Sequence, residues 1–220
     1  MSRASQLAMA AGRQAMTDAG LGEQVPDPER SGIILGTGIG GFDEGLNAWE
    51  TFKTKGLRRV NPFTAMALLC NMPAHHLALR FQCQAYNNTT VTACASGSQA
   101  LGDAAEVIRR GATDLMLAGG TEGMVHEMIV GAFTVMRVLA ADNDNPAQAC
   151  KPFDARRDGI GTEPVDDRDA VGLVAVDHAD DQDAGATGDA APDEGDRPAL
   201  DRAPDLDLHV GRHPGCLRGR

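Results

Sequence analysis

The 220-residue chain has few aromatic residues and no cysteine pair with the spacing of a metal site. It contains one Trp, one Tyr and six Phe. Its five cysteines (Cys70, Cys83, Cys94, Cys150 and Cys216) form no CxxC motif and no Cys/His ligand spacing, which argues against structural zinc. An odd number of cysteines without a signal peptide favours a reducing compartment, so we expect a cytoplasmic protein.

The sequence also lacks a basic patch and an apolar run of membrane-spanning length. Residues 161–220 carry 15 acidic residues and six arginines, a net charge of −9, whereas residues 1–160 carry 16 acidic and 14 basic residues, a net charge of −2. A chain with this charge distribution is not expected to bind nucleic acid. A bilayer span needs roughly 20 consecutive apolar residues. No run approaches that length, so we expect no membrane association.

The last 60 residues lack eight amino-acid types altogether: Ile, Phe, Met, Tyr, Trp, Lys, Ser and Asn. Such a composition buries too little apolar surface to offset the entropy lost on ordering. We therefore predict an acidic tail over residues 160–220 that is mostly disordered. Only GLVAV, residues 172–176, has the pattern of a strand.

Residues 1–159 alternate between helical and strand patterns, which predicts an α/β layered fold with buried strands. Pro73 interrupts a long apolar helical pattern and predicts a kink or a break there. The predicted helices cover residues 3–19, part of 38–56, 64–81, 96–111 and about 127–135, and the predicted strands cover residues 31–37, 88–93 and 113–120.

GTGIGG, residues 36–41, follows a predicted strand and precedes a predicted helix, as a dinucleotide-binding motif does. Such a site also needs an acidic residue at the end of a second strand about 20 positions further on. That region is RRVNPF instead. A glycine-lined turn between a strand and a helix needs no cofactor, so nucleotide binding is the weaker interpretation.

Cys94 lies in VTACASGSQA, residues 91–100, at the predicted junction of a strand and a helix. Backbone N–H groups at a helix N-terminus stabilise a thiolate and can help to hold an oxyanion. On spacing alone, a packed small side chain remains the commoner explanation for Cys94. We interpret Cys70, Cys83 and Cys150 as structural, because two lie on or beside an apolar helix and the third precedes KPFD.

Several stretches resemble the N-terminal half of β-ketoacyl-acyl-carrier-protein synthases, and most of all the elongating type II condensing enzymes. They are RRVNPF, NMPAHHLALRF, TVTACASGSQALGDAAEVIRRGATDLMLAGGTEG, GAFTVMRVLAADNDNP and KPFDARRDG, and they span about residues 1–159 in order. The resemblance implies a thiolase-like fold, of which this would be the N-terminal half of an αβαβα arrangement. It also implies a homodimer and acyl transfer without a redox cofactor.

The resemblance assigns the nucleophile to Cys94, which takes an acyl chain as a thioester from the phosphopantetheine of acyl carrier protein. Malonyl carrier protein then loses CO₂, and its carbanion attacks that thioester. The resemblance further assigns the acyl pocket to Ile39 and Phe133, and docking of the acidic carrier protein to Arg58, Arg59 and Arg137.

The sequence departs from the family pattern in three places. Family members have a first strand ahead of the helix in which this chain opens, and they continue after PFD-x-x-RDG with a GEGAG stretch that is IGTEPVDDRDA here. Their HGTxTP-like and K-x-x-x-GH-like motifs, which carry the catalytic histidines, and their GFGG loop are absent, and His178, His209 and His213 lie in other contexts. We expect a ketosynthase domain over residues 1–159 without its first strand, a tail over 160–220 that is disordered or the product of a shifted reading frame, and little condensation by this chain alone.

Two other interpretations stay open at this point. The chain could be a non-catalytic partner of an active synthase, comparable to the chain-length factors of polyketide assembly. Those subunits usually lack the cysteine, so Cys94 argues against this alternative. A nucleotide-binding domain would rest on GTGIGG alone.

Overall fold

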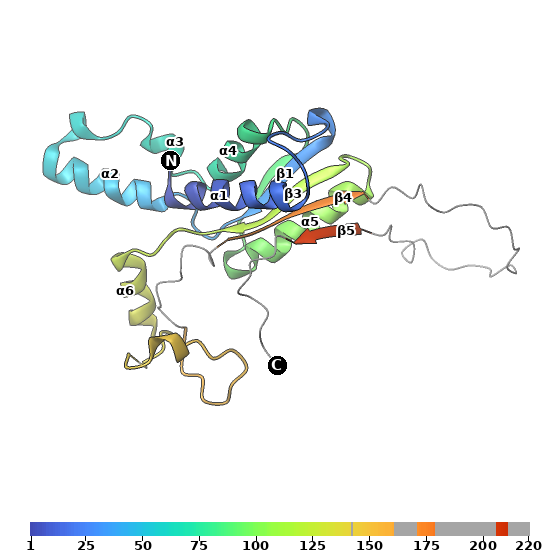
Figure 1. Cartoon of the computed structure of the whole chain (residues 1–220). Coiled ribbons are helices and arrows are strands. Elements are labelled where there is room, and N and C mark those ends of the chain that lie inside the picture. Colours follow the sequence, from blue (N-terminus) through green and yellow to red (C-terminus); the bar gives the residue numbers. More distant parts are fainter. Residues whose placement is uncertain (142, 161–170, 179–205, 211–220) are drawn as a thin grey trace, which may run out of the picture.

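The structure, a computed structural model, describes residues 1–141, 143–160, 171–178 and 206–210. It is built on one five-stranded sheet, whose strands can be followed in Figure 1. Strand β1 pairs in parallel with β2 on one side and with β3 on the other, while β4 and β5 continue the sheet in antiparallel pairing. In spatial order the strands are β2 (Asn87–Thr90), β1 (Ser31–Gly36), β3 (Leu115–Thr121), β4 (Val171–His178) and β5 (Leu206–Val210).

Helices cover both faces of this sheet (Figure 1). On one face, α1 (Arg3–Asp18) and α4 (Met72–Phe81) form an apolar cluster with Ile33 and Leu35 of β1. On the other face, α5 (Ser96–Arg109) packs against Ile34 of the same strand. Successive side chains of a strand point to opposite faces, so β1 supplies both clusters and is buried throughout. The predicted α/β layered fold is confirmed.

Helix α1 begins and ends as its sequence predicts. The side chain of Ser2 caps the helix by accepting a hydrogen bond from the backbone N–H of Ser5 at 3.3 Å. Gly20, with a φ of 69°, follows the C-terminal end. Six of the eight buried residues are Ala, Ser or Gly, and these small side chains let the helix lie close to the sheet.

Glycines allow the first turn of α5 to lie directly on the ends of β1 and β3. A methyl group added to Gly36 would lie 2.1 Å from the carbonyl oxygen of Ser96. A methyl group on Gly120 would lie 3.1 Å from the Cα atom of Gly97. Only residues without a side chain permit this approach, which fixes the helix start against the sheet.

The apolar pattern over residues 64–81 is divided into two helices, α3 (Thr64–Ala67) and α4. Pro73 occupies the first turn of α4, where its missing N–H costs no hydrogen bond. The predicted break at Pro73 is therefore confirmed, and it falls just ahead of the proline.

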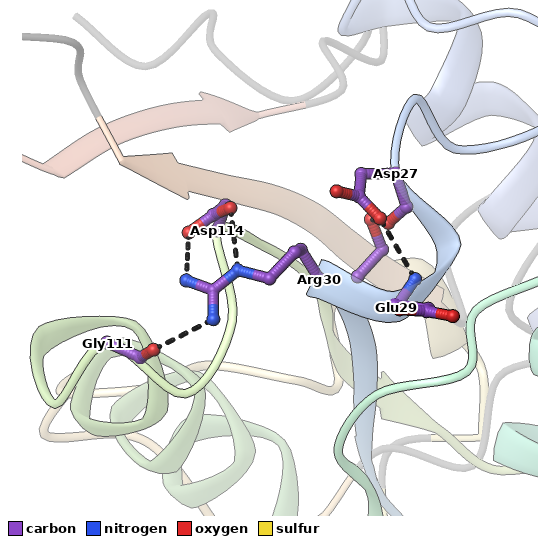
Figure 2. A network of polar contacts seen from close by, with 6 residues as sticks. Asp27, Glu29, Arg30, Gly111 and Asp114 are labelled. Atoms are coloured by element: carbon purple, nitrogen blue, oxygen red, sulfur yellow. Dashed lines mark hydrogen bonds and ion pairs between the residues drawn. The ribbon is translucent and has the colours of Figure 1, made fainter.

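At the amino end of the parallel strands, Arg30 joins two segments that are distant in sequence (Figure 2). Its guanidinium group donates to both carboxylate oxygens of Asp114 and, at 3.1 Å, to the carbonyl oxygen of Gly111. The hydrogen bond with Asp114 raises the pKa of Arg30. This pair connects the start of β1 to the α5–β3 loop, at the edge of the sheet opposite to the one where β1 leads into GTGIGG.

Two helices project from the layered body, α2 (Phe42–Lys55) and α6 (Glu127–Met136) (Figure 1). Every residue of both helices is at least partly exposed. A short 3₁₀ turn, Leu57–Arg59, follows α2. None of the described helices is long and apolar enough to cross a membrane.

The segment after residue 160 is only partly described. The strand expected at residues 172–176 is present within β4. Strand β5 is a second strand in this segment, where the sequence predicted only the one at residues 172–176. The other residues predicted to be disordered, 161–170, 179–205 and 211–220, lie outside the described part of the chain.

Candidate functional site

Cys94 lies between β2 and α5, in the 3₁₀ turn Ala93–Ala95, and its side chain is exposed. The preceding residue, Ala93, has a φ of 51°, in the left-handed region that non-glycine residues seldom adopt. The backbone N–H of Ala95 donates to the carbonyl oxygen of Thr92 at 3.1 Å and closes the turn. The expected strand-to-helix junction at Cys94 is present.

The hydroxyl group of Ser96 holds this turn together from inside. It accepts a hydrogen bond from the backbone N–H of Thr92 at 2.8 Å. Its oxygen also lies 2.7 Å from the carbonyl oxygen of Ala93 and 3.1 Å from that of Thr37. The single hydroxyl proton is shared between these two acceptors. Ser96 is 3% exposed; its contact with Thr37 is buried, and those with Thr92 and Ala93 are partly buried.

The carboxylate of Glu122 organises the neighbouring loop, which begins at Thr37. Its Oε2 atom accepts hydrogen bonds from the backbone N–H groups of Gly38 at 2.9 Å and Ile39 at 3.0 Å, with the Thr37 hydroxyl at 3.4 Å. Its Oε1 atom accepts from the N–H of Gly123 at 3.2 Å. Hydrogen bonds to an ionised acceptor are about twice as strong as neutral ones, so the loop is firmly held.

This arrangement weighs against nucleotide binding at GTGIGG. A glycine-rich loop binds phosphate through free backbone N–H groups. Here the N–H groups of Gly38 and Ile39 already donate to Glu122, and the carboxylate would repel a phosphate. The glycines instead allow close packing, since a methyl group on Gly40 would lie 2.6 Å from the Cα atom of Cys70.

The loop containing Ile39 lies beside the Cys94 turn. A methyl group on Gly38 would lie 3.9 Å from the Cα atom of Ala93. On its other side, the carbonyl oxygen of Ile39 is 3.6 Å from the thiol of Cys70. The structure thus brings the segments of Cys94 and Ile39 together, although they are far apart in the sequence.

The remaining predicted site residues lie on the projecting helices or on the turn after α2. Phe133 is on α6 and is 38% exposed. Arg137 follows α6 with a φ of 58°. Arg58 and Arg59 lie in the turn Leu57–Arg59, and all three arginines are exposed. Their exposure is compatible with docking, which stays a prediction, as does the role of Phe133.

The other cysteines differ from Cys94 in their surroundings. Cys83 packs against the cluster under α1 and α4, and burial raises the pKa of its thiol to about 12. Cys70 packs against Gly40. Both are partly buried, which agrees with the predicted structural role. Cys150 is exposed, so that prediction is wrong for Cys150, while Cys216 lies outside the described residues.

His76 and His126 have surroundings set by their own helices. Burial and the neighbouring His75 lower the pKa of His76 on α4. His126 caps α6 by accepting a hydrogen bond from the backbone N–H of Met128 at 3.1 Å. Within the described part of the chain, no cluster of three or more His, Cys, Asp or Glu side chains could hold a metal ion.

Residues 1–162 match the family model described as beta-ketoacyl synthase, N-terminal domain. The chain belongs to the β-ketoacyl synthase family. Among curated relatives, it is 39% identical over 160 residues to a putative mitochondrial 3-oxoacyl-[acyl-carrier-protein] synthase of Schizosaccharomyces pombe, covering 71% of this chain and 37% of the relative. It is also 39% identical over 155 residues to 3-oxoacyl-[acyl-carrier-protein] synthase 2 of Rhizobium meliloti, covering 70% of this chain and 37% of the relative.

Solved ketosynthases have the same fold. A β-ketoacyl synthase from Burkholderia phymatum superposes with a TM-score of 0.63 at 33% identity, covering 72% of this chain and 39% of that one. The ishigamide ketosynthase/chain length factor gives a TM-score of 0.64 at 28% identity, covering 72% and 38%. The predicted thiolase-like fold, as the N-terminal half of a ketosynthase, is confirmed. The chain spans less than half the length of these relatives.

Sequence reasoning missed three residues of this candidate site: Thr37, Ser96 and Glu122. Each lies where a parallel strand ends or a helix begins, which is the edge of an α/β sheet where ligands bind. Glu122 directly follows β3, and that position was the available signal. The contacts between these residues span 59 to 85 positions of sequence, which no local pattern reveals.

Proposed function

We propose that this chain carries the acyl-transfer site of a β-ketoacyl-acyl-carrier-protein synthase, with Cys94 as the nucleophile. The observation that carries this proposal is the exposed thiol on a tightly bonded turn between β2 and α5, within a domain that belongs to the ketosynthase family. A helix N-terminus beside the thiol favours the thiolate and an oxyanion at the attacked carbonyl.

The acyl-transfer step follows from this geometry. The Cys94 thiolate attacks the carbonyl carbon of an acyl-phosphopantetheine thioester and forms a new carbon–sulfur bond. The bond to the phosphopantetheine sulfur breaks, and that sulfur leaves as a thiolate, so the acyl chain remains on Cys94. A covalent intermediate of this kind divides one difficult reaction into two easier ones.

The complete reaction of the family adds a condensation. A malonyl group on acyl carrier protein loses CO₂, and the carbanion attacks the Cys94 thioester and releases the Cys94 thiolate. We propose that this chain alone condenses negligibly, because the motifs that carry the catalytic histidines are absent from its sequence. Removal of one oxyanion donor alone typically lowers a rate by about 10²–10³-fold, and groups that act as a unit are strongly non-additive.

Substrate and partner assignments rest on the same proposal. Ile39 and Phe133 would border the acyl chain, and Arg58, Arg59 and Arg137 would dock acyl carrier protein, whose phosphopantetheine carries the substrate in place of a free cofactor. One structural relative is a type II polyketide acyl-carrier protein in complex with its ketosynthase, with a TM-score of 0.60 at 27% identity. It covers 71% of this chain and 40% of that one.

We further propose a homodimer, as the family resemblance implies, in the reducing cytoplasm that the cysteine content favours. Apolar side chains that monomers seldom expose lie on α6 and just ahead of it, with Val135 84% and Val125 86% exposed. A large exposed apolar surface is typical of an interaction site. A second subunit would remove these side chains from water.

Mass spectrometry after incubation with an acyl-pantetheine thioester tests the acyl transfer. We expect a single acyl adduct on Cys94 that Cys94→Ala abolishes. Cys150→Ala is the matched control, because Cys150 is the other exposed cysteine of the described chain and should leave the adduct unchanged. An adduct that depends equally on both cysteines, or no adduct at all, would show that Cys94 has no special reactivity towards thioesters.

A second candidate function is that of a non-catalytic partner, favoured by the likeness to the ishigamide ketosynthase/chain length factor. That function needs no acylation of Cys94. Absence of the adduct together with a stable complex with an intact ketosynthase would favour it.

A further inference from the structure

Two groups of polar contacts surround Cys94, and both involve Thr37. Thr37 is 2% exposed and follows β1 directly. Its carbonyl oxygen is 3.1 Å from the Ser96 hydroxyl, and its backbone N–H donates to the carbonyl oxygen of Thr90 at 3.1 Å. Its own hydroxyl donates to Glu122 and accepts from the N–H of Gly40 at 3.0 Å. The ends of three strands and the start of α5 therefore meet at one residue.

The Cys94 turn needs such support because its backbone is strained. Ala93 has a φ of 51°, and strain of this type persists only where surrounding contacts hold the backbone in place. The Ser96 hydroxyl supplies those contacts on both sides of Ala93, at the N–H of Thr92 and at the carbonyl oxygen of Ala93 itself. Without the hydroxyl, the turn is free to relax to an ordinary conformation.

Glu122 has the corresponding role for the loop beside the turn. It binds the N–H groups of Gly38 and Ile39, and a methyl group on Gly38 would lie 3.1 Å from its Oε2 atom. The carboxylate thus fits closely against the loop that faces Ala93. Movement of this loop would change the surroundings of Cys94 directly.

We propose that Ser96 and Glu122 are positioning residues that, through Thr37, hold the Cys94 turn and the Ile39 loop in one geometry and thereby set the reactivity of the Cys94 thiol. The proposal rests on the proposed function in that it takes Cys94 as the nucleophile. Neither residue touches the substrate in this scheme; both act by fixing the backbone on which Cys94 and Ile39 are placed.

Competitive alkylation of the full chain with iodoacetamide, read by peptide mass spectrometry, tests this directly. The quantity measured is the rate at Cys94 divided by the rate at Cys150, an exposed thiol outside this network. Loss of one hydrogen bond corresponds to roughly a fivefold change in an equilibrium. We expect Ser96→Ala to lower the ratio roughly fivefold, because the relaxed turn no longer presents Cys94 at the start of α5.

Two matched control variants test whether the effect depends on where the substituted residue lies or only on its type. Ser98→Ala removes an exposed serine two residues along the same helix, and Glu50→Gln neutralises an exposed carboxylate on α2. Both should leave the ratio unchanged. Glu122→Gln preserves the shape of the side chain but weakens its hydrogen bonds, so we expect a fall of roughly twofold to threefold.

Cys83 reports whether each variant is still folded, because it is partly buried against the core and burial raises the pKa of its thiol, so its labelling should be slow until the core opens. If Ser96→Ala makes Cys83 accessible and so disturbs the fold, the proposal is judged on the Cys94/Cys150 ratio of the Glu122→Gln variant. A ratio equal to that of the controls in a folded variant overturns the proposal. Exposure of Cys83 in both variants also overturns it, because the contacts would then serve the fold as a whole. Alkylation needs no thioester, so failure of the proposed acyl transfer would be seen separately, in the unsubstituted chain.

Discussion

Helix α5, with 14 residues, and helix α6, with 10, have opposite surroundings. In α5, the residues Ala100, Ala104, Val107 and Ile108 are buried against the sheet, at the spacing of one helix face. In α6, with the sequence EMIVGAFTVM, no residue is buried. The more apolar of the two helices is therefore the more exposed one.

The difference teaches that the described part of the chain combines a packed body with one apolar helix, α6, that the described residues leave exposed. A helix that is apolar all round is typical of a buried position in a larger protein. The match covers 37% of the length of the two curated relatives named above. The comparison of α5 with α6 divides the described domain into a packed part and a peripheral part. Three predictions test that division, beginning with the largest expected effect.

Core truncation should separate the two parts most clearly. Ile34 is fully buried beneath α5. Ile34→Ala should therefore lower the free energy of unfolding by about 2–5 kcal/mol. Val135 on α6 is 84% exposed, so Val135→Ala should change that free energy by less than about 0.5 kcal/mol. Urea denaturation followed by circular dichroism measures both. Equal losses would mean that α6 is packed after all.

Replacing a glycine by alanine should change the free energy of unfolding with opposite signs in the packed part and in α6. Gly36→Ala would place its Cβ atom 2.1 Å from the carbonyl oxygen of Ser96, and we expect a loss of about 1–3 kcal/mol. Gly131 of α6 has no atom within 4 Å of that position, so Gly131→Ala should gain up to about 1 kcal/mol from helix propensity. Thermal unfolding of the two variants gives the comparison, and stabilisation by Gly36→Ala would contradict the tight packing of α5.

The smallest effect concerns thiol chemistry and pH. Burial raises the pKa of Cys83 to about 12, so the folded chain keeps this thiol protonated. Because the unfolded chain has the lower pKa, the associated stability is complete below about pH 9 and is lost as the pH rises towards 12. Exposed Cys150 should react with maleimide at pH 8, whereas Cys83 should not. Labelling of Cys83 as fast as that of Cys150 would show that the packed part opens readily.

The sequence predicted the elements of residues 1–159 well because each has a strong local signal. Gly20 and Gly111 end their helices, Pro73 divides another, and β1 is a continuous apolar run between polar segments. Cys94 was placed correctly at the end of a β-branched run.

Contacts across the sheet could not be predicted in this way. Glu122 and Ser96 bind partners that are distant in sequence, and the exposure of Phe133 depends on what packs beside α6 rather than on its own residues. Strand β5 was not predicted because the apolar residues of LDLHV alternate with Asp and His, and the segment around them is acidic. Its pairing depends on β4 as a template, which a local pattern does not contain.

The order of the strands has a consequence for shorter versions of this chain. The family match ends at residue 162, yet the sheet continues through β4 and β5, which lie beyond it. A polypeptide cut at the end of the match would leave one side of β3 with a row of unsatisfied N–H and C=O groups. Such an open border invites pairing between molecules and the growth of aggregates. The strands beyond the family match thus act as a cover for those within it.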